Sequence, residues 1–334
     1  MKALIDKSLK AFIGMFAFAA LLLVSQRVSA QSFSAQLSDK DIPVSEFNSL
    51  NVADDFEVTV SRGAYGVRLT VDKDLSPYVE VYVKSKTLNL VYNEKSVPKE
   101  LKKMYKGKNA LKPIFRAVVY VPELQSVSLS DNATLTALEE FTASQFELNA
   151  TGKSQVTSLS VTASSAKVNL KKNATAALIL KTDRGVEAGV DNSANLKMSF
   201  TGKELALNTE GSSVVVVDGP CKTLNLFTSG SSQVTVSSET EKVNLTTEGS
   251  SKLALSGKAR EMTVKGSRNS TVDAFNLPVE TVDADLSNSS SVTVNVSRYV
   301  EVNLVGGSSL YYNGSPEFKI EKIVKSTLAP FGTK

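Results

Sequence analysis

The sequence predicts an all-β protein in which about ten coils of a parallel β-helix follow an irregular N-terminal β region. The stretch Leu224–Val234 returns nineteen residues later as Val243–Leu253, with nearly the same residue types. An apolar residue after a Gly, Asn or Ser turn recurs at steps of 18 to 21 residues. These residues are Leu135, Val156, Ala176, Leu196, Val215, Val234, Leu253, Val272, Val292 and Leu310. Because so short a unit cannot bury its own apolar face, each unit must stack on the next.

Each unit contains a short strand before its turn, with side chains that alternate between the inside and the outside. The residues six and four places before the turn are apolar in all nine units that have both. They are Phe146, Leu148, Ala166, Val168, Val186, Ala188, Leu205, Leu207, Leu224, Leu226, Val243, Leu245, Met262, Val264, Val282, Ala284, Val300 and Val302. The residues between them are mostly polar. Among these, Glu147, Lys167 and Glu187 alternate in sign, so they should attract one another on adjacent coils.

The alternation continues after the turn, so one unit holds two or three short strands. Strands that return in phase lie about 4.8 Å apart and form parallel sheets. A propeller blade needs about 40 residues, and helical repeats need a helical period, which does not persist here. Gly211, Gly230 and Gly249 are each followed by two serines, whose hydroxyls can bond the backbone groups left open at a corner.

Residues 1–30 have the features of a signal peptide: three early lysines, the apolar stretch Ala11–Val24, and small residues before Gln31. We therefore expect export through a cleaved signal peptide to the periplasm, the cell surface or the medium. The apolar stretch is short for a membrane span, and none is expected in the mature chain. Removing residues 1–30 reduces the 38 basic and 34 acidic groups to 34 and 33. This near-neutral balance argues against a nucleic-acid partner.

The remaining chain divides by pattern into four parts. We predict a flexible leader at 31–41, an N-terminal β region at 42–125, β-helix repeats at 126–317 and a C-terminal tail at 318–334. Period-two alternation in the N-terminal region predicts strands at Phe56–Val60, Val67–Val71, Val79–Val83, Leu88–Tyr92 and Ile114–Val121.

A lysine-rich insertion at 94–113 interrupts this region. Pro98 is placed to open a short helix whose apolar face would combine Leu101, Met104 and Tyr105. The lysines form either a solvated surface or a binding surface for an acidic partner such as an anionic glycan or a lipid headgroup. The candidate residues for that surface are Lys99, Lys102, Lys103 and Lys106.

The composition excludes several kinds of chemistry. Histidine is absent, which removes imidazole bases, Ser/His and Cys/His nucleophile pairs and His-ligated metals. Cys221 is the only cysteine, so it packs as a small apolar side chain or forms an intermolecular disulfide. We expect no cofactor, no metal and no catalytic residue.

Carboxylate pairs keep a second function class open, because many exported β-helices act on polysaccharides. A glycosidase needs two carboxylates facing one groove, roughly 5 to 9.5 Å apart. The pairs to consider are Asp283 with Asp285, Asp54 with Asp55, and Glu210 with Glu248. Their alternative interpretation is that of solvated surface acids. No aromatic ring recurs at a fixed outward position to serve as a sugar platform.

The chain also resembles a known family. The segments that carry the resemblance are Phe47–Val52, Phe56–Val60, Leu75–Val79 and Thr87–Leu90, followed by the Gly/Ser-rich repeats. They are similar to the putative auto-transporter adhesin, head GIN domain family of exported Bacteroidetes proteins. The resemblance implies a right-handed parallel β-helix of pectin-lyase-like shape, a role in adhesion and no catalytic motif.

We therefore expect a non-enzymatic exported solenoid that binds a glycan or an envelope or host protein. The alternative is a carbohydrate-active enzyme, a lyase or a hydrolase, on the same fold.

Overall fold

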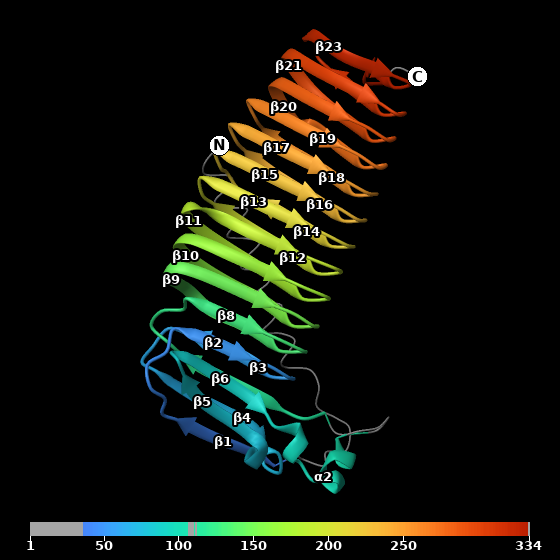
Figure 1. The fold of residues 1–334 in the computed structure, drawn as a ribbon. Helices are drawn as coiled ribbons and strands as arrows, with labels where there is room; N and C mark the ends of the chain where they lie inside the picture. The colour runs from blue at the N-terminus through green and yellow to red at the C-terminus, as the bar shows by residue number, and fades with distance from the viewer. Residues whose placement is uncertain (1–35, 106–109, 111, 333–334) are drawn as a thin grey trace. The chain divides into compact units, whose positions relative to one another are not determined.

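The computed structural model describes residues 36–105, 110 and 112–332. The expected signal peptide at 1–30 and Lys106 lie outside these residues. Within the unit that begins at Leu37, the chain forms an all-β solenoid of about eleven turns from residue 126 to residue 330, after an irregular N-terminal β region (Figure 1). The predicted fold class is thereby confirmed.

The N-terminal region mixes parallel and antiparallel strands. Its strands are β1 (Leu37–Ile42), β2 (Ser49–Val52), β3 (Glu57–Ser61), β4 (Gly66–Asp72), β5 (Val79–Lys84), β6 (Thr87–Tyr92), β7 (Phe115–Tyr120) and β8 (Ser126–Leu129). β1 pairs antiparallel with β4, β4 with β7 and β5 with β6, whereas β3 with β7 and β2 with β6 and β8 are parallel pairs. All five strands predicted in this region are present.

The first strand lies where the sequence indicated a leader. β1 follows the outer edge of β4, and Arg68 Nε forms an ion pair with Asp41 Oδ1 at 2.9 Å. Four of the six β1 side chains are exposed, so no apolar alternation marks this strand in the sequence.

The lysine-rich insertion contains two short helices, the 3-10 helix η2 (Glu94–Ser96) and α2 (Lys99–Met104), after a first 3-10 helix η1 (Ser76–Tyr78). Pro98 precedes α2 as its N-cap. Leu101 and Tyr105 pack against the core, as expected, but Met104 is 49% exposed and takes no part in that face. The prediction that Met104 shares this apolar face is therefore wrong; Met104 is the last residue of α2, and Tyr105 is its C-cap.

The solenoid strands stack in one direction from green to red in Figure 1. They are β9 (Thr134–Ala150), β10 (Gln155–Leu170), β11 (Thr175–Val190), β12 (Asn195–Thr201), β13 (Glu204–Thr209), β14 (Val214–Asp218), β15 (Thr223–Thr228), β16 (Gln233–Glu239), β17 (Lys242–Thr247), β18 (Lys252–Lys258), β19 (Glu261–Gly266), β20 (Thr271–Leu286), β21 (Ser291–Val305), β22 (Ser309–Asn313), β23 (Glu317–Val324) and β24 (Thr327–Pro330). All pairs among them are parallel.

The register confirms the inward assignment. In the pair of β15 with β17, Leu224 lies beside Val243 and Leu226 beside Leu245. All eighteen side chains predicted to point inward are at most 5% exposed. They belong to one continuous apolar core, so the coils depend on one another for burial.

The corners stack as predicted. Gly211, Gly230 and Gly249 have φ of 71°, 73° and 72°, the left-handed region that a side chain rarely adopts. The buried Ser232 donates a hydrogen bond to the Ser229 carbonyl at 2.9 Å. Equivalent serines one coil before and one coil after make the same contact.

The solenoid has one turn more than predicted, because β23 and β24 lie in the stretch 318–334 that was assigned to a tail. They pair in parallel with β21 and β22. A register shift after Val302 places Glu321 between two pairs of the ladder. This irregularity and the charges of β23 interrupt the alternation that identifies the other coils.

Candidate functional site

A groove of about 800 Å³ runs across the early coils of the solenoid. Its walls come from β2, β8, β9, β10, β11 and β13, with Gln145, Ser165, Arg184 and Glu204 along one side. Six strands at about 4.8 Å spacing extend over roughly 24 Å. The groove is therefore long enough to follow an extended ligand along the axis of the coils.

The groove crosses the three long strands β9, β10 and β11. The ladder places Gln145 beside Ser165, Ser165 beside Gly185, and Gly185 beside Glu204. A register shift in the pair of β10 with β11 lies just before this point. A Cβ on Gly185 would lie 2.3 Å from the Glu204 carbonyl oxygen, so a glycine is needed for the two coils to approach here.

Charges of both signs line this groove. Lys167 Nζ lies 3.4 Å from Glu187 Oε1, and Glu204 Oε1 accepts a hydrogen bond from Asn225 Nδ2 at 2.6 Å. Glu147 accepts a hydrogen bond from Asn149 Nδ2 at 3.0 Å, and no ion pair joins it to Lys167 in the described part of the chain. One of the two expected attractions in this column is thus present. The arrangement offers exposed donors and acceptors on a sheet, which suits the recognition of hydroxyls more than chemical catalysis.

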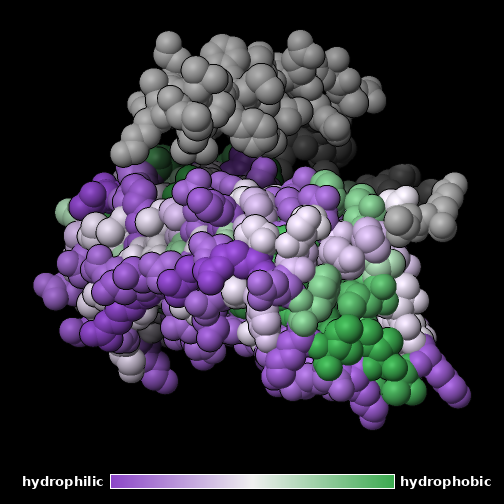
Figure 2. Space-filling model, turned by 90° about the horizontal axis from the view of Figure 1, so that it is seen from above, coloured by the Kyte–Doolittle hydropathy of each residue, from purple (hydrophilic) through white to green (hydrophobic). Residues whose placement is uncertain are grey.

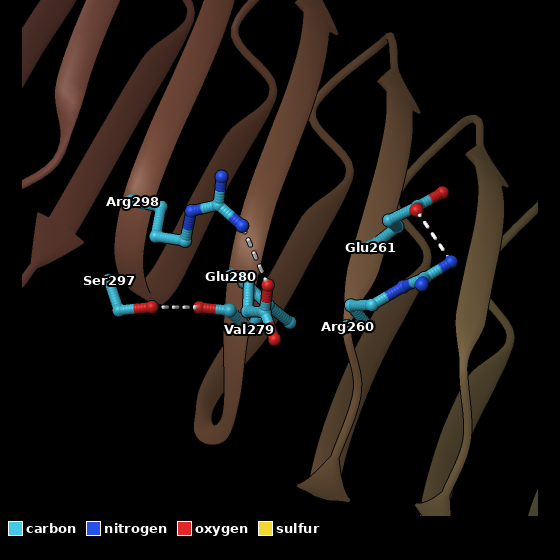
Figure 3. Close-up of polar contacts among 6 residues, drawn as sticks. All are labelled: Arg260, Glu261, Val279, Glu280, Ser297 and Arg298. Atoms are coloured by element: carbon cyan, nitrogen blue, oxygen red, sulfur yellow. Dashed lines mark hydrogen bonds and ion pairs between the residues drawn. The ribbon is translucent and has the colours of Figure 1, made fainter.

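A smaller groove of about 270 Å³ lies on the later coils, between β16 and β21. Beside it, Arg298 Nη1 pairs with Glu280 Oε2 at 3.1 Å and Ser297 Oγ donates to the Val279 carbonyl at 3.3 Å (Figure 3). Arg260 Nη2 pairs with Glu261 Oε1 at 2.9 Å on the neighbouring coil. Both arginines are therefore engaged by carboxylates.

The lysines singled out in the sequence do not line either groove. Lys99 and Lys103 are exposed on α2, and Lys102 is half-buried. Lys106 lies outside the described residues. The acidic-partner surface on this helix stays a prediction.

The candidate acid pairs do not line the grooves either. Asp285 accepts a hydrogen bond from Asn303 Nδ2 at 3.1 Å, while its exposed neighbour Asp283 lies on the same strand. Glu248 faces Arg268 at 3.6 Å. Burial raises the pKa of Asp54, which accepts a hydrogen bond from the Tyr92 backbone N–H at 3.2 Å.

The possible metal ligands and the single cysteine within residues 36–105, 110 and 112–332 could each carry chemistry of their own. These described residues contain no group of three or more His, Cys, Asp and Glu side chains arranged to hold a metal ion. Cys221 is buried, with its Sγ 3.7 Å from Ser238 Oγ and Thr240 Oγ1, as expected for a packing role. None of the helices in this part of the chain is long and apolar enough to cross a bilayer.

Sequence reasoning missed the polar row formed by Gln145, Ser165, Arg184 and Glu204. It did single out the column Glu147, Lys167 and Glu187, but only for its effect on register. The same column lines the groove.

Several solved structures are similar to this chain. A putative adhesin from Parabacteroides merdae is 18% identical, with 89% of this chain and 97% of that chain covered and a TM-score of 0.36. A putative adhesin from Parabacteroides distasonis is 19% identical; the match covers 89% of this chain and 98% of that chain, with a TM-score of 0.32. A putative lipid binding protein from Parabacteroides distasonis is 13% identical; the match covers 89% of this chain and 97% of that chain, with a TM-score of 0.34. No curated protein matches the sequence.

One family model matches most of the chain. It is described as putative auto-transporter adhesin, head GIN domain, and it matches residues 46–199 and 178–316. The two matches overlap and together include the N-terminal β region from β2 onward and nearly all the coils. The chain therefore belongs to the putative auto-transporter adhesin, head GIN domain family.

Proposed function

We propose that this protein is a non-enzymatic, exported binding module of the cell envelope, and that the larger groove binds a polar, uncharged glycan. The observation that carries the proposal is the groove of about 800 Å³ lined by amides, hydroxyls and charges of both signs. Such groups donate to and accept from sugar hydroxyls, and their net charge is too small to select a polyanion. The family description, which names adhesion and no reaction, supports the same class.

The rigidity of the coils favours such a role. The groove side chains stand on ladders whose inward neighbours are almost fully buried, for example Val168 and Leu205. A preformed site loses little conformational entropy on binding. The groove can therefore hold a weakly interacting chain of sugars without first folding around it.

Export is part of the same proposal. Residues 1–30 have the composition of a signal peptide, and the family is that of auto-transporter adhesins. The N-terminal sequence of the protein recovered from the cell envelope tests this directly. A start at Gln31 is expected, and a chain that retains Met1 in the cytoplasm would contradict export.

A glycan array followed by calorimetry tests the binding site. Arg184→Ala removes an exposed donor from the groove and should lower the affinity for the selected glycan by roughly tenfold. Arg298→Ala is the matched control, because this arginine is exposed on a later coil and does not line the larger groove. Equal losses in both variants, or no neutral glycan bound by the unmodified protein, would show that the groove is not the site.

A further inference from the structure

The C-terminal end of the solenoid leaves part of its core open. Ile320 and Ile323 of β23 lie beside the fully buried Val302 and Leu304 in the inward column. They are nevertheless 56% and 37% exposed, because the described chain forms no further coil over them. Phe331, which is 53% exposed, is not part of this open core, because its ring packs against Phe275 of β20 with the centroids 4.8 Å apart. Figure 2 looks onto the end that carries β23 and shows a hydrophobic area there, in green.

The strand edge at this end is open as well. Among the described residues, the ladder pairs of β23 all involve β21. The opposite end of the solenoid is different, since its edge strand β1 is antiparallel to its neighbour and carries Asp39, Lys40 and Asp41. β23 is also charged, with Glu317, Lys319, Glu321 and Lys322, so its edge can pair with another strand only where opposite charges face one another.

The sequence of β23 is complementary to itself when two copies run antiparallel. A two-fold axis between Glu321 and Lys322 places Ile320 opposite Ile323 of the second copy, and Glu321 opposite Lys322 of the second copy. The symmetry repeats each contact once, so both apolar residues and both charges find a partner. This is the pattern of an isologous interface.

We propose that two copies of this chain associate end to end through β23, with their strands antiparallel across a two-fold axis and their apolar cores joined. Ile320 and Ile323 supply the apolar contact, and Glu321 and Lys322 set the register. This surface lies on the last coil and is separate from both grooves.

Sedimentation of the protein purified after export tests this interface over a range of concentrations. The unmodified chain should form a dimer of twice the mass of one chain. Glu321→Lys places lysine opposite lysine on both sides of the axis and should weaken the dimer by roughly tenfold. The double variant Glu321→Lys with Lys322→Glu restores opposite charges, so it should dimerise like the unmodified protein.

Ile323→Asp should also give monomers, because it places an unpaired carboxylate in the joined core. Ile179→Asp is its matched control, since Ile179 is likewise 37% exposed but lies on the side of β11. It should leave the dimer intact, and thermal melting of every variant should show that the coils remain folded. A monomer at all concentrations, a growing filament, or failure of the double variant to dimerise would each overturn the proposal.

Discussion

At the scale of single residues, the corners combine a left-handed backbone with buried hydroxyls. Ser213, Ser232 and Ser251 are at most 1% exposed, and each donates to a carbonyl three residues before it. A buried carbonyl without a partner costs about 1 to 3 kcal/mol. These serines therefore stabilise the turns.

Ser232→Ala should lower the free energy of unfolding by about 1 kcal/mol, because it removes the hydrogen bond to the Ser229 carbonyl. Its control is Ser231→Ala at the exposed neighbouring position, which should have little effect. Chemical denaturation of both variants checks this. Equal stabilities would mean that the buried hydroxyl does not hold the corner.

A second residue-scale prediction concerns Glu140. Hydrogen bonds from Lys181 Nζ, at 2.7 Å, and from Thr162 Oγ1 lower the pKa of this carboxyl. A carboxyl with a lowered pKa in the folded state contributes stability above its unfolded pKa, and this contribution is lost as the pH falls through the folded value. Lys181→Ala should therefore raise the pKa of Glu140 toward its ordinary value, as measured by NMR titration. An unchanged titration would contradict the contact.

At the scale of elements, the strand is stable only within the stack. Leu226 lies between Leu207 and Leu245 in the ladders on either side of β15. All three side chains are at most 3% exposed. Each coil thus packs directly against the next, so a substitution that destabilises one coil should also destabilise its neighbours.

Leu226→Asp should lower the free energy of unfolding by more than about 3 kcal/mol, because it leaves an uncompensated charge in the core. Thr235→Asp, at an exposed position on β16, is the control and should melt like the unmodified protein. Circular dichroism on heating distinguishes them. Similar melting of the two variants would mean that Leu226 does not point inward.

The elements also show what the sequence could and could not predict. The repeat strands were predictable because the same residues follow two patterns at once. Leu224 and Leu226, for example, are apolar both in the nineteen-residue repeat and in the two-residue alternation of a strand. β1 was missed because it lies on an edge and needs no apolar face. β23 was missed because a register shift at Glu321 disrupts its alternation. The groove could not be predicted, because it depends on which outward residues of neighbouring coils lie side by side, and the sequence does not show that Gly185 closely approaches Glu204.

At the scale of the whole molecule, the groove and the open end lie on different coils of the solenoid. If two copies associate through β23, each dimer carries two grooves. Two linked sites can bind a polymer much more tightly than one site, provided that both are engaged together. An adhesive role would benefit from this arrangement because each sugar contact is weak.

In the proposed function, the larger groove binds a glycan and leaves it intact. The most direct measurement is calorimetry with the glycan selected on the array, followed by analysis of the recovered ligand. We expect saturable binding that Arg184→Ala weakens by roughly tenfold, with the glycan recovered at its original length. Recovery of shortened or unsaturated products would contradict the account and would indicate a hydrolase or a lyase.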